Sequence, residues 1–341
     1  MTALPPATNA PLRGGAVLRW GILAPGAIAH DWADAVRTFT DQRITAVASR
    51  DRDRARAFAE PRGIPAAYGS YQHLLEDADV DVVYVAAPNS EHVHLAHAAI
   101  DHGKHVLVEK PMAMTAAEVV ALGDHARTRG VFLMEAMWSR FLPQSTIIAQ
   151  LLSDGALGEL RSATADFSSR VPFDPTNRVY DPALGGGCLA DLGVYSSWFV
   201  RFVLGPASSV VARGQVAPTG VEDHAVVVSE HADGAVGVAI SSLRAASAHK
   251  ATVVGENGMI EVSDPFWSPH GMTLTVDGVT TSWSDPSPIR GRAGLAYQVA
   301  AVAAHVGLGR LEAPEHPIAA TVEVMGALET AAASIRTSPR G

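Results

Sequence analysis

The strongest constraint on the fold is an alternation of short apolar runs with helical stretches between residues 17 and 135. The apolar runs occupy residues 17–23, 44–48, 82–87, 106–108 and 131–134, and the helical stretches occupy residues 27–37, 51–60, 92–102 and 116–129. Strands that alternate with helices are typical of a parallel sheet covered on both faces. The runs are continuously apolar, as doubly buried strands require. Residues 17–139 are therefore predicted to form a doubly wound α/β domain built on a parallel sheet.

Beyond residue 142 the pattern changes to longer stretches in which apolar and polar residues alternate, such as LRSATADFSSRV, HAVVVSEH and AVGVAISSL. Turns such as ADG, ENG and VDG separate these stretches. The pattern predicts a hairpin-rich sheet with one covered face. Residues 140–341 are thus predicted to form a C-terminal α+β domain with a large open, mostly antiparallel sheet. Residues 1–16 are predicted to be a flexible leader.

Charge and cysteine usage narrow the class of protein. The chain carries 35 acidic and 26 basic residues, a net charge of −9, which argues against nucleic acid or an anionic membrane as a partner. The amino end lacks a signal-peptide pattern and the chain lacks a run of 18 apolar residues, so we expect a cytoplasmic protein without a membrane span. The single cysteine, Cys188, excludes an internal disulfide and a cysteine-cage metal site, and we expect it to be a small buried residue.

The first predicted strand leads into the turn WGILAPGAIAHDW. In a dinucleotide-binding fold the backbone N–H groups of this turn approach a pyrophosphate at a helix N-terminus. The usual G-x-G-x-x-G/A pattern falls on Ala24, Gly26 and Ala29, so the first glycine is missing. The residues predicted to bind the pyrophosphate are Ala24, Pro25, Gly26, Ala27 and Ile28.

The end of the second strand bears on the choice of cofactor. An acidic residue there would hold the ribose 2′-hydroxyl of NAD, but VASRDRDRAR offers Ser49 and Arg50, with Arg54 one helical turn on. A guanidinium group pairs bidentately with phosphate, so these residues favour NADP, with NAD possible. The alternative is a solvated helix start in which Asp51 and Asp53 neutralise the arginines.

The third strand ends in a proline, and loops at the carboxyl ends of such strands face the ligand crevice. Ala87, Pro88, Asn89 and His92 are therefore predicted to contact the cofactor, and Asn89 or Ser90 to cap the following helix. The histidines at 92, 94 and 97 lack the i, i+4 spacing and the acidic neighbours of a metal site, so we predict no bound metal. The next strand ends in LVEKPMAM, with Glu109 and Lys110 immediately before a proline.

Three segments together resemble the Gfo/Idh/MocA family of NAD(P)-dependent oxidoreductases. They are GILAPGAIA, VYVAAPNSEHVHLAHAAIDHGKHVLVEKPMA and GGGCLADLGVY, and their order and spacing match over nearly the whole chain. The stretch MEAMWSRFLP is similar to the branch of dimeric dihydrodiol dehydrogenases and NADP-dependent xylose or glucose dehydrogenases. The resemblance implies that residues 17–139 form a Rossmann dinucleotide-binding domain. It implies that residues 140–341 form a substrate-binding domain whose open sheet makes a homodimer, and that the peptide before Pro111 is cis.

The resemblance also implies the roles of particular residues. Lys110 would project beside the nicotinamide, and Glu109 would orient it. Tyr195, where many members carry histidine, would be the acid/base, with a pKa lowered by Lys110 and by the oxidised nicotinamide. Asp191, four residues earlier, would bind substrate hydroxyls or position Lys110. The remaining substrate-binding residues implied are Trp138 and Phe167 as an aromatic wall, with Arg161 as a polar neighbour. The alternative for Tyr195 and for the aromatic residues is a purely structural place in the core.

We therefore predict an NAD(P)-dependent oxidoreductase that transfers a hydride at a hydroxyl-bearing carbon of a small sugar or sugar-like diol. Two alternatives stay open: redox-assisted glycoside hydrolysis with a tightly bound NAD, and a non-catalytic NADP-binding sensor. The presence of both Lys110 and Tyr195 argues against the sensor, and Arg50 argues against the hydrolase. Arg170 and Arg178 lie in a loop that can border the pocket but are not placed by the sequence.

Overall fold

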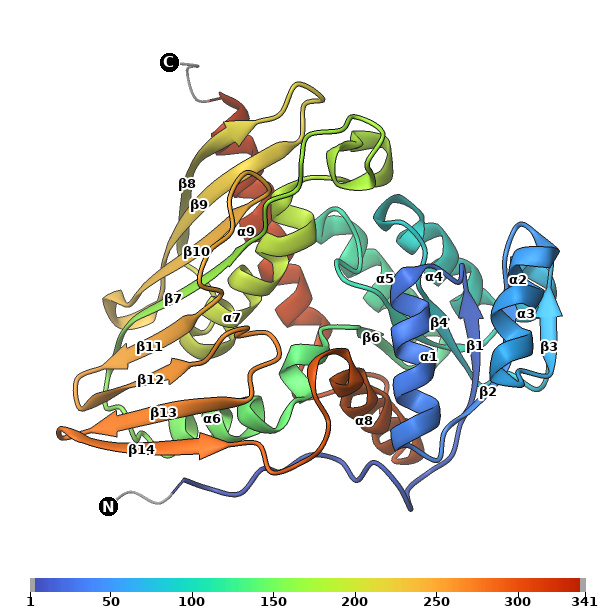
Figure 1. Cartoon of the computed structure of the whole chain (residues 1–341), viewed down its shortest axis with the longest axis horizontal. Coiled ribbons are helices and arrows are strands. Elements are labelled where there is room, and N and C mark those ends of the chain that lie inside the picture. Colours follow the sequence, from blue (N-terminus) through green and yellow to red (C-terminus); the bar gives the residue numbers. More distant parts are fainter. Residues whose placement is uncertain (1–3, 338–341) are drawn as a thin grey trace.

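A computed structural model describes residues 4–337. The amino-terminal lobe alternates strands and helices as predicted (Figure 1). Its elements are β1 (Arg19–Leu23), α1 (Ala27–Phe39), β2 (Arg43–Ala48), α2 (Arg52–Ala59), β3 (Ala66–Tyr68), α3 (Tyr71–Leu75), β4 (Val82–Val85), α4 (His92–Asp101), β5 (His105–Val108), α5 (Ala116–Arg129) and β6 (Leu133–Glu135). The strands form one parallel six-stranded sheet in the order β3-β2-β1-β4-β5-β6.

This sheet is buried because its strands are apolar on both faces. All four residues of β4 are fully buried, as are Trp20, Ile22 and Leu23 of β1. The strand order reverses between β1 and β4, and ligands of such sheets bind at this switch point, beyond the carboxyl ends of the strands. The predicted Rossmann architecture is confirmed.

The carboxy-terminal lobe contains an eight-stranded sheet in the order β14-β13-β12-β11-β7-β10-β9-β8. Its elements are α6 (Pro143–Ser153), β7 (Leu160–Ser168), α7 (Val194–Leu204), β8 (Ser209–Val216), β9 (Glu222–Glu230), β10 (Val236–Ser242), β11 (Ala251–Gly255), β12 (Gly258–Val262), β13 (Gly271–Val276), β14 (Val279–Ser284), α8 (Leu295–Gly307) and α9 (Ile318–Thr337). Only β7 and β10 run parallel, so the sheet is mostly antiparallel, as predicted.

Helices lie on one face of this sheet, between it and the Rossmann lobe (Figure 1). The last two helices return to the first lobe, because α8 packs against α1 and α9 packs against α5 and β6. The two lobes are therefore joined by more than the chain crossing near residue 139, and the cleft between them has packed walls.

The segment before β1 differs from the flexible leader that the sequence predicts. Pro6 O accepts a hydrogen bond from Gln150 Nε2 at 2.9 Å, and Thr8 N donates one to Thr146 Oγ1 at 3.0 Å. The described part, residues 4–16, thus lies along α6 and the lower edge of the molecule in Figure 1. Residues 1–3 of the predicted leader lie outside the described residues.

Helix α9 is long and apolar enough, by length and composition, to cross a membrane. In this structure it packs against α5, α7 and β8, and Val324, Met325 and Leu328 are buried. Its apolar surface therefore has partners within the chain, as in a core helix.

Candidate active site

A cleft of about 510 Å³ lies between the lobes at the carboxyl ends of the parallel strands. A volume of this size is typical of a small-molecule site. Every residue that the sequence predicts for the site, apart from Arg161, lines this cleft. They are Ala24, Pro25, Gly26, Ala27, Ile28, Ser49, Arg50, Arg54, Ala87, Pro88, Asn89, His92, Glu109, Lys110, Trp138, Phe167, Asp191 and Tyr195.

The turn after β1 forms the nucleotide end of the cleft. Ala24, at the position of the missing glycine, adopts the left-handed conformation with φ of 62°. Gly26 precedes α1 without any side-chain cap, and a Cβ built on it would meet no heavy atom closer than 3.8 Å. The first N–H groups of a helix have no partner within the helix, so the open N-terminus of α1 is suited to an anionic group. These residues fit the pyrophosphate of a dinucleotide.

Arg50 and Arg54, which follow β2, are exposed at the nucleotide end of the cleft. Asp51 is occupied as the cap of α2, where its carboxylate accepts N–H bonds from Asp53 and Arg54. Asp53 approaches Arg56 at 3.9 Å. Among the described residues neither Arg50 nor Arg54 forms an ion pair, so the alternative in which Asp51 and Asp53 neutralise them is not what the structure has.

His92 and Asn89 hold the loops around the cleft. His92 is fully buried, with Nδ1 2.7 Å from Pro111 O and Nε2 2.9 Å from Ala87 O. Burial lowers the pKa of His92, against the smaller raising effect of these carbonyl contacts. Neither Asn89 nor Ser90 caps the following helix as predicted, since no side-chain cap bond is present at its start. The amide of Asn89 instead donates to Gly185 O of the other lobe at 3.0 Å.

Lys110 from the first lobe meets Asp191 and Tyr195 from the second. Its ammonium group donates to the backbone oxygen of Asp191 at 2.8 Å and lies 3.9 Å from Asp191 Oδ1. It also lies over the ring of Tyr195, 4.8 Å from the centroid. The peptide bond between Lys110 and Pro111 is cis. Asp191 sits in a π-helical turn, Leu189–Gly193, that leads into α7 and presents both groups to the lysine.

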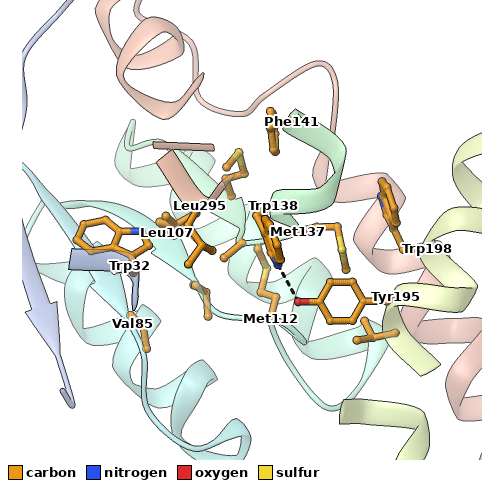
Figure 2. Packing of buried hydrophobic residues seen from close by; sticks show 14 of the residues in the cluster. Trp32, Val85, Leu107, Met112, Met137, Trp138, Phe141, Tyr195, Trp198 and Leu295 are labelled. Carbon is orange, nitrogen blue, oxygen red and sulfur yellow. Dashed lines mark hydrogen bonds between the residues drawn. The ribbon is translucent and has the colours of Figure 1, made fainter. Parts of the chain in front are cut away.

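The hydroxyl of Tyr195 accepts a hydrogen bond of 2.9 Å from Trp138 Nε1 (Figure 2). The structure corrects the expected sign of the pKa shift: burial, reinforced by the carboxylate of Glu109, raises the pKa of Tyr195 well above the usual value for tyrosine. Lys110 faces the ring rather than the oxygen, and its charge does not offset the loss of water. In this state Tyr195 is a neutral phenol at pH 7.

The carboxylates differ in their surroundings. Burial raises the pKa of Glu109, which accepts a hydrogen bond from Tyr84 Oη at 2.5 Å. Burial alone would also raise the pKa of Asp191, but the charges of Lys110 and Arg178 hold it below the usual value. Arg178 donates to Asp191 Oδ1 at 3.0 Å, which places an arginine that the sequence left unplaced.

The predicted aromatic wall has a third member that the sequence analysis missed. Phe167 stacks on Trp267, with ring centroids 3.5 Å apart, and Trp267 lies 6.3 Å from the ring of Tyr195. Trp267 follows a second cis peptide, Asp264–Pro265, in a segment with no motif to mark it. Arg292, in the turn η8 (Gly291–Gly294), also lines the cleft and was missed.

The prediction that Arg161 borders the substrate pocket is wrong. Its guanidinium pairs with Glu159 at 2.8 Å and Glu256 at 2.5 Å, at the exposed end of β7. β7 pairs with β11, and this register brings Glu256 beside the start of β7, away from the cleft.

A buried hydrogen bond between Glu135 and His316 anchors the segment after Lys110. Glu135, at the end of β6, accepts N–H of Met112 at 3.0 Å and lies 2.9 Å from Nε2 of His316. Both side chains are 2% exposed, and Thr321 donates to the same carboxylate at 3.2 Å. The backbone after Lys110 is thus linked to the start of α9, a contact that no local sequence pattern predicts.

No cluster of three or more His, Cys, Asp or Glu side chains suited to a metal ion occurs within residues 4–337. Cys188 is buried, and burial raises the pKa of its thiol to about 12, which fits a small packing residue rather than a reactive thiolate.

Comparison with known proteins agrees with the fold and the site. Residues 18–137 match the model of an oxidoreductase family with an NAD-binding Rossmann fold, and residues 146–261 match the GFO/IDH/MocA C-terminal domain. The chain therefore belongs to the Gfo/Idh/MocA family and is an NAD(P)-dependent dehydrogenase or reductase that acts on CH–OH groups.

Within this family the chain is similar to enzymes named as diol dehydrogenases. The chain is 36% identical over 310 residues to a trans-1,2-dihydrobenzene-1,2-diol dehydrogenase from Macaca fascicularis. The aligned region covers 88% of this chain and 92% of the relative. It is 38% identical over 275 residues to the enzyme of that name from Danio rerio, covering 80% and 81%.

Solved structures show the same arrangement of lobes. A 3-ketoreductase from Actinomadura kijaniata, in a complex with NADP and TDP-benzene, is similar with a TM-score of 0.79 and 26% identity, covering 93% of this chain and 98% of that one. Levoglucosan dehydrogenase in a complex with NADH and levoglucosan has a TM-score of 0.84 at 19% identity, covering 93% and 97%, which shows the fold alone.

Proposed function

We propose that this chain is an NADP-dependent oxidoreductase that interconverts a secondary hydroxyl and a carbonyl group on a sugar or a sugar-like diol. The observation that carries the proposal is the meeting of Lys110, Asp191 and Tyr195 across the cleft, with Lys110 Nζ 2.8 Å from Asp191 O and 4.8 Å from the Tyr195 ring. The relatives named as diol dehydrogenases support the substrate class.

The choice of NADP rests on Arg50 and Arg54. Both line the cleft, and neither has an ion-pair partner among the described residues, so both are free to pair with a 2′-phosphate. Gly26 and the open N-terminus of α1 would hold the pyrophosphate. When bound, the nicotinamide ring supplies the acceptor or donor of the hydride.

The protein groups would handle the proton. Tyr195 is a neutral phenol, so in reduction it would donate its proton to the substrate carbonyl oxygen as the hydride arrives. In oxidation Tyr195 would first lose its proton to solvent, and the N–H of Trp138 at 2.9 Å would stabilise the resulting phenolate. The phenolate would then take the proton of the substrate hydroxyl as the hydride leaves. Lys110 would hold the substrate oxygen near Tyr195, and the stacked rings of Phe167 and Trp267 would exclude water from one side.

The test is a spectrophotometric screen of sugars and diols with NADP, followed by Lys110→Met on the best substrate. We expect the variant to fold, to bind NADPH with its fluorescence response intact, and to lose nearly all turnover. Lys250→Met is the control, since that lysine is exposed and does not line the cleft. Wild-type rates in Lys110→Met would remove this residue from the mechanism. Protein that turns over without added NADP would favour the hydrolase instead.

The open sheet face supports a homodimer. Val211, Val228 and Val238 are cross-strand neighbours on β8, β9 and β10, on the face opposite the helices, and Val211 is 59% exposed. A row of apolar side chains on an uncovered sheet favours burial against a second copy. Light scattering that gives a monomer mass at micromolar concentration would contradict this.

A further inference from the structure

Arg292 is held beside the substrate end of the cleft by its neighbours in the chain. Gly291 O accepts a hydrogen bond from Ser268 Oγ at 3.3 Å. Gly294 lies so close to Trp138 that a Cβ built on it would be 3.1 Å from the indole ring. The guanidinium therefore projects from a turn that packs directly on the aromatic wall, and its charge lowers the pKa values of Asp191 and Tyr195.

The present partner of Arg292 is weakly bound. Its Nη1 lies 2.5 Å from Oδ2 of Asp31 on α1, and the two side chains are 59% and 43% exposed. An exposed ion pair of this kind contributes about 0–1 kcal/mol, because water and salt screen it. Arg292 can therefore exchange Asp31 for another anion at little cost.

The cations at this end of the cleft differ in where their carboxylate partners lie. Lys110 and Arg178 share the carboxylate of Asp191, at 3.9 and 3.0 Å. Glu109 accepts a hydrogen bond from the hydroxyl of Tyr84. Arg292 differs from these two cations, because its partner Asp31 lies outside the lining of the cleft. Nothing in the transfer of a hydride and a proton at a neutral diol requires Arg292.

We infer that Arg292 is a specificity-determining residue that binds a carboxylate or phosphate group carried by the substrate, so that the preferred substrate is an acidic hydroxy compound. The inference rests on the proposed function. A guanidinium group forms two parallel hydrogen bonds with such a group, which a neutral sugar cannot reproduce. The same chemistry is offered by the pyrophosphate of the cofactor, and the experiment separates these two sources.

The experiment compares glucuronate and glucose 6-phosphate with glucose, using wild type, Arg292→Gln and Arg292→Lys. We expect wild type to prefer at least one of the acidic probes. We expect Arg292→Gln to lose at least about tenfold more kcat/KM on that probe than on glucose, which corresponds to about 1.4 kcal/mol. Arg292→Lys should fall between the two, since it keeps the charge without the bidentate geometry.

Arg290→Gln is the matched control, because Arg290 belongs to the same loop, lies outside the cleft and faces Asp285 at 3.8 Å. It should leave the ratio between the probes unchanged. Equal losses on all three probes in Arg292→Gln, or wild type preferring glucose, would overturn the inference. A weaker Kd for NADPH without substrate would assign the arginine to the cofactor instead.

Binding of glucuronate and of glucose 6-phosphate to the NADPH-loaded protein, measured by calorimetry, separates failure of this inference from failure of the proposed function. Binding that depends on Arg292 without any turnover would uphold the anion site and refute the proposed reaction. Turnover of neutral sugars, with no binding of acidic ones, would refute only the anion site.

Discussion

Replacing Trp138 by phenylalanine tests whether the oxygen of Tyr195 carries the proton. The indole N–H donates to that oxygen at 2.9 Å, and the two residues are 5% and 7% exposed, so water does not substitute for the lost donor. A hydrogen bond to a neutral group contributes about 0.5–1.5 kcal/mol, and one to a charged group about 1.5–3 kcal/mol. The difference, about 1–1.5 kcal/mol, is the extra stabilisation that the Trp138 hydrogen bond gives to the phenolate form of Tyr195 over its neutral form.

That difference corresponds to a fall of about five- to tenfold in kcat for oxidation at a fixed pH. The direction of the pH effect follows from the same bond. The Trp138 hydrogen bond lowers the pKa of Tyr195, so its loss raises that pKa further. Oxidation needs the phenolate, so its rate rises with pH through this pKa, and in Trp138→Phe the rise should move to higher pH. Reduction converts the phenol of Tyr195 into phenolate, so its transition state loses the same stabilisation, and below this pKa its rate should fall by a comparable factor.

The assay is the initial rate of NADP reduction and of NADPH oxidation across pH, with Trp267→Phe as the matched control. The Trp267→Phe variant also removes an indole, but the Trp267 ring stacks on Phe167 and, among residues 4–337, donates no hydrogen bond to Tyr195. This control variant should raise KM and leave the pH dependence in place. Identical pH profiles for Trp138→Phe and wild type would refute the role of Tyr195 as acid/base.

Two further predictions concern the nucleotide end. Arg50→Asp should shift the ratio of kcat/KM towards NAD, because a carboxylate repels a 2′-phosphate and accepts from a ribose hydroxyl; an unchanged ratio would place the phosphate elsewhere. Ala24→Gly should stabilise the protein by about 0.5–1 kcal/mol in urea unfolding, because glycine adopts the observed φ of 62° without steric cost. If Ala24→Gly unfolds at a lower urea concentration than wild type, the packing of the Ala24 methyl group stabilises the fold by more than the left-handed backbone destabilises it.

The strands and helices that the sequence predicted correctly are those that depend on residues close together in the chain. Continuous apolar runs marked the parallel strands because burial on both faces leaves no polar positions. The ends of those strands then fixed Ser49, Asn89 and Lys110 at one edge of the sheet, since parallel strands share their carboxyl edge.

The misplaced and missed residues depend on contacts between distant segments. Arg161 leaves the pocket because the pairing of β7 with β11 sets Glu256 beside it, and a single sequence does not give that register. Trp267 and Arg292 reach the cleft from irregular loops, whose course no periodicity encodes. The sign of the Tyr195 pKa shift depended on burial, which a list of neighbouring charges does not contain.

The glycines of GGGCLADLGVY show how a local motif produces a contact between lobes. A Cβ on Gly186 would lie 2.7–2.9 Å from three backbone oxygens, including those of Arg178 and Val179, so only glycine lets that loop pack against the motif. The packed loop carries Arg178 to the carboxylate of Asp191. With its carboxylate engaged, Asp191 offers its backbone oxygen to Lys110 at 2.8 Å.

Gly185 likewise allows a close approach, here between the second lobe and Asn89 of the first lobe. A Cβ there would lie 2.9 Å from Cβ of Asn89, whose amide donates to Gly185 O, and the residue has φ of 72°. Any larger residue would push the second lobe away from the strand ends that carry Lys110. The direction of the lysine is therefore set by how closely two backbones approach, while the carboxylate of Asp191 lies between Arg178 at 3.0 Å and Lys110 at 3.9 Å.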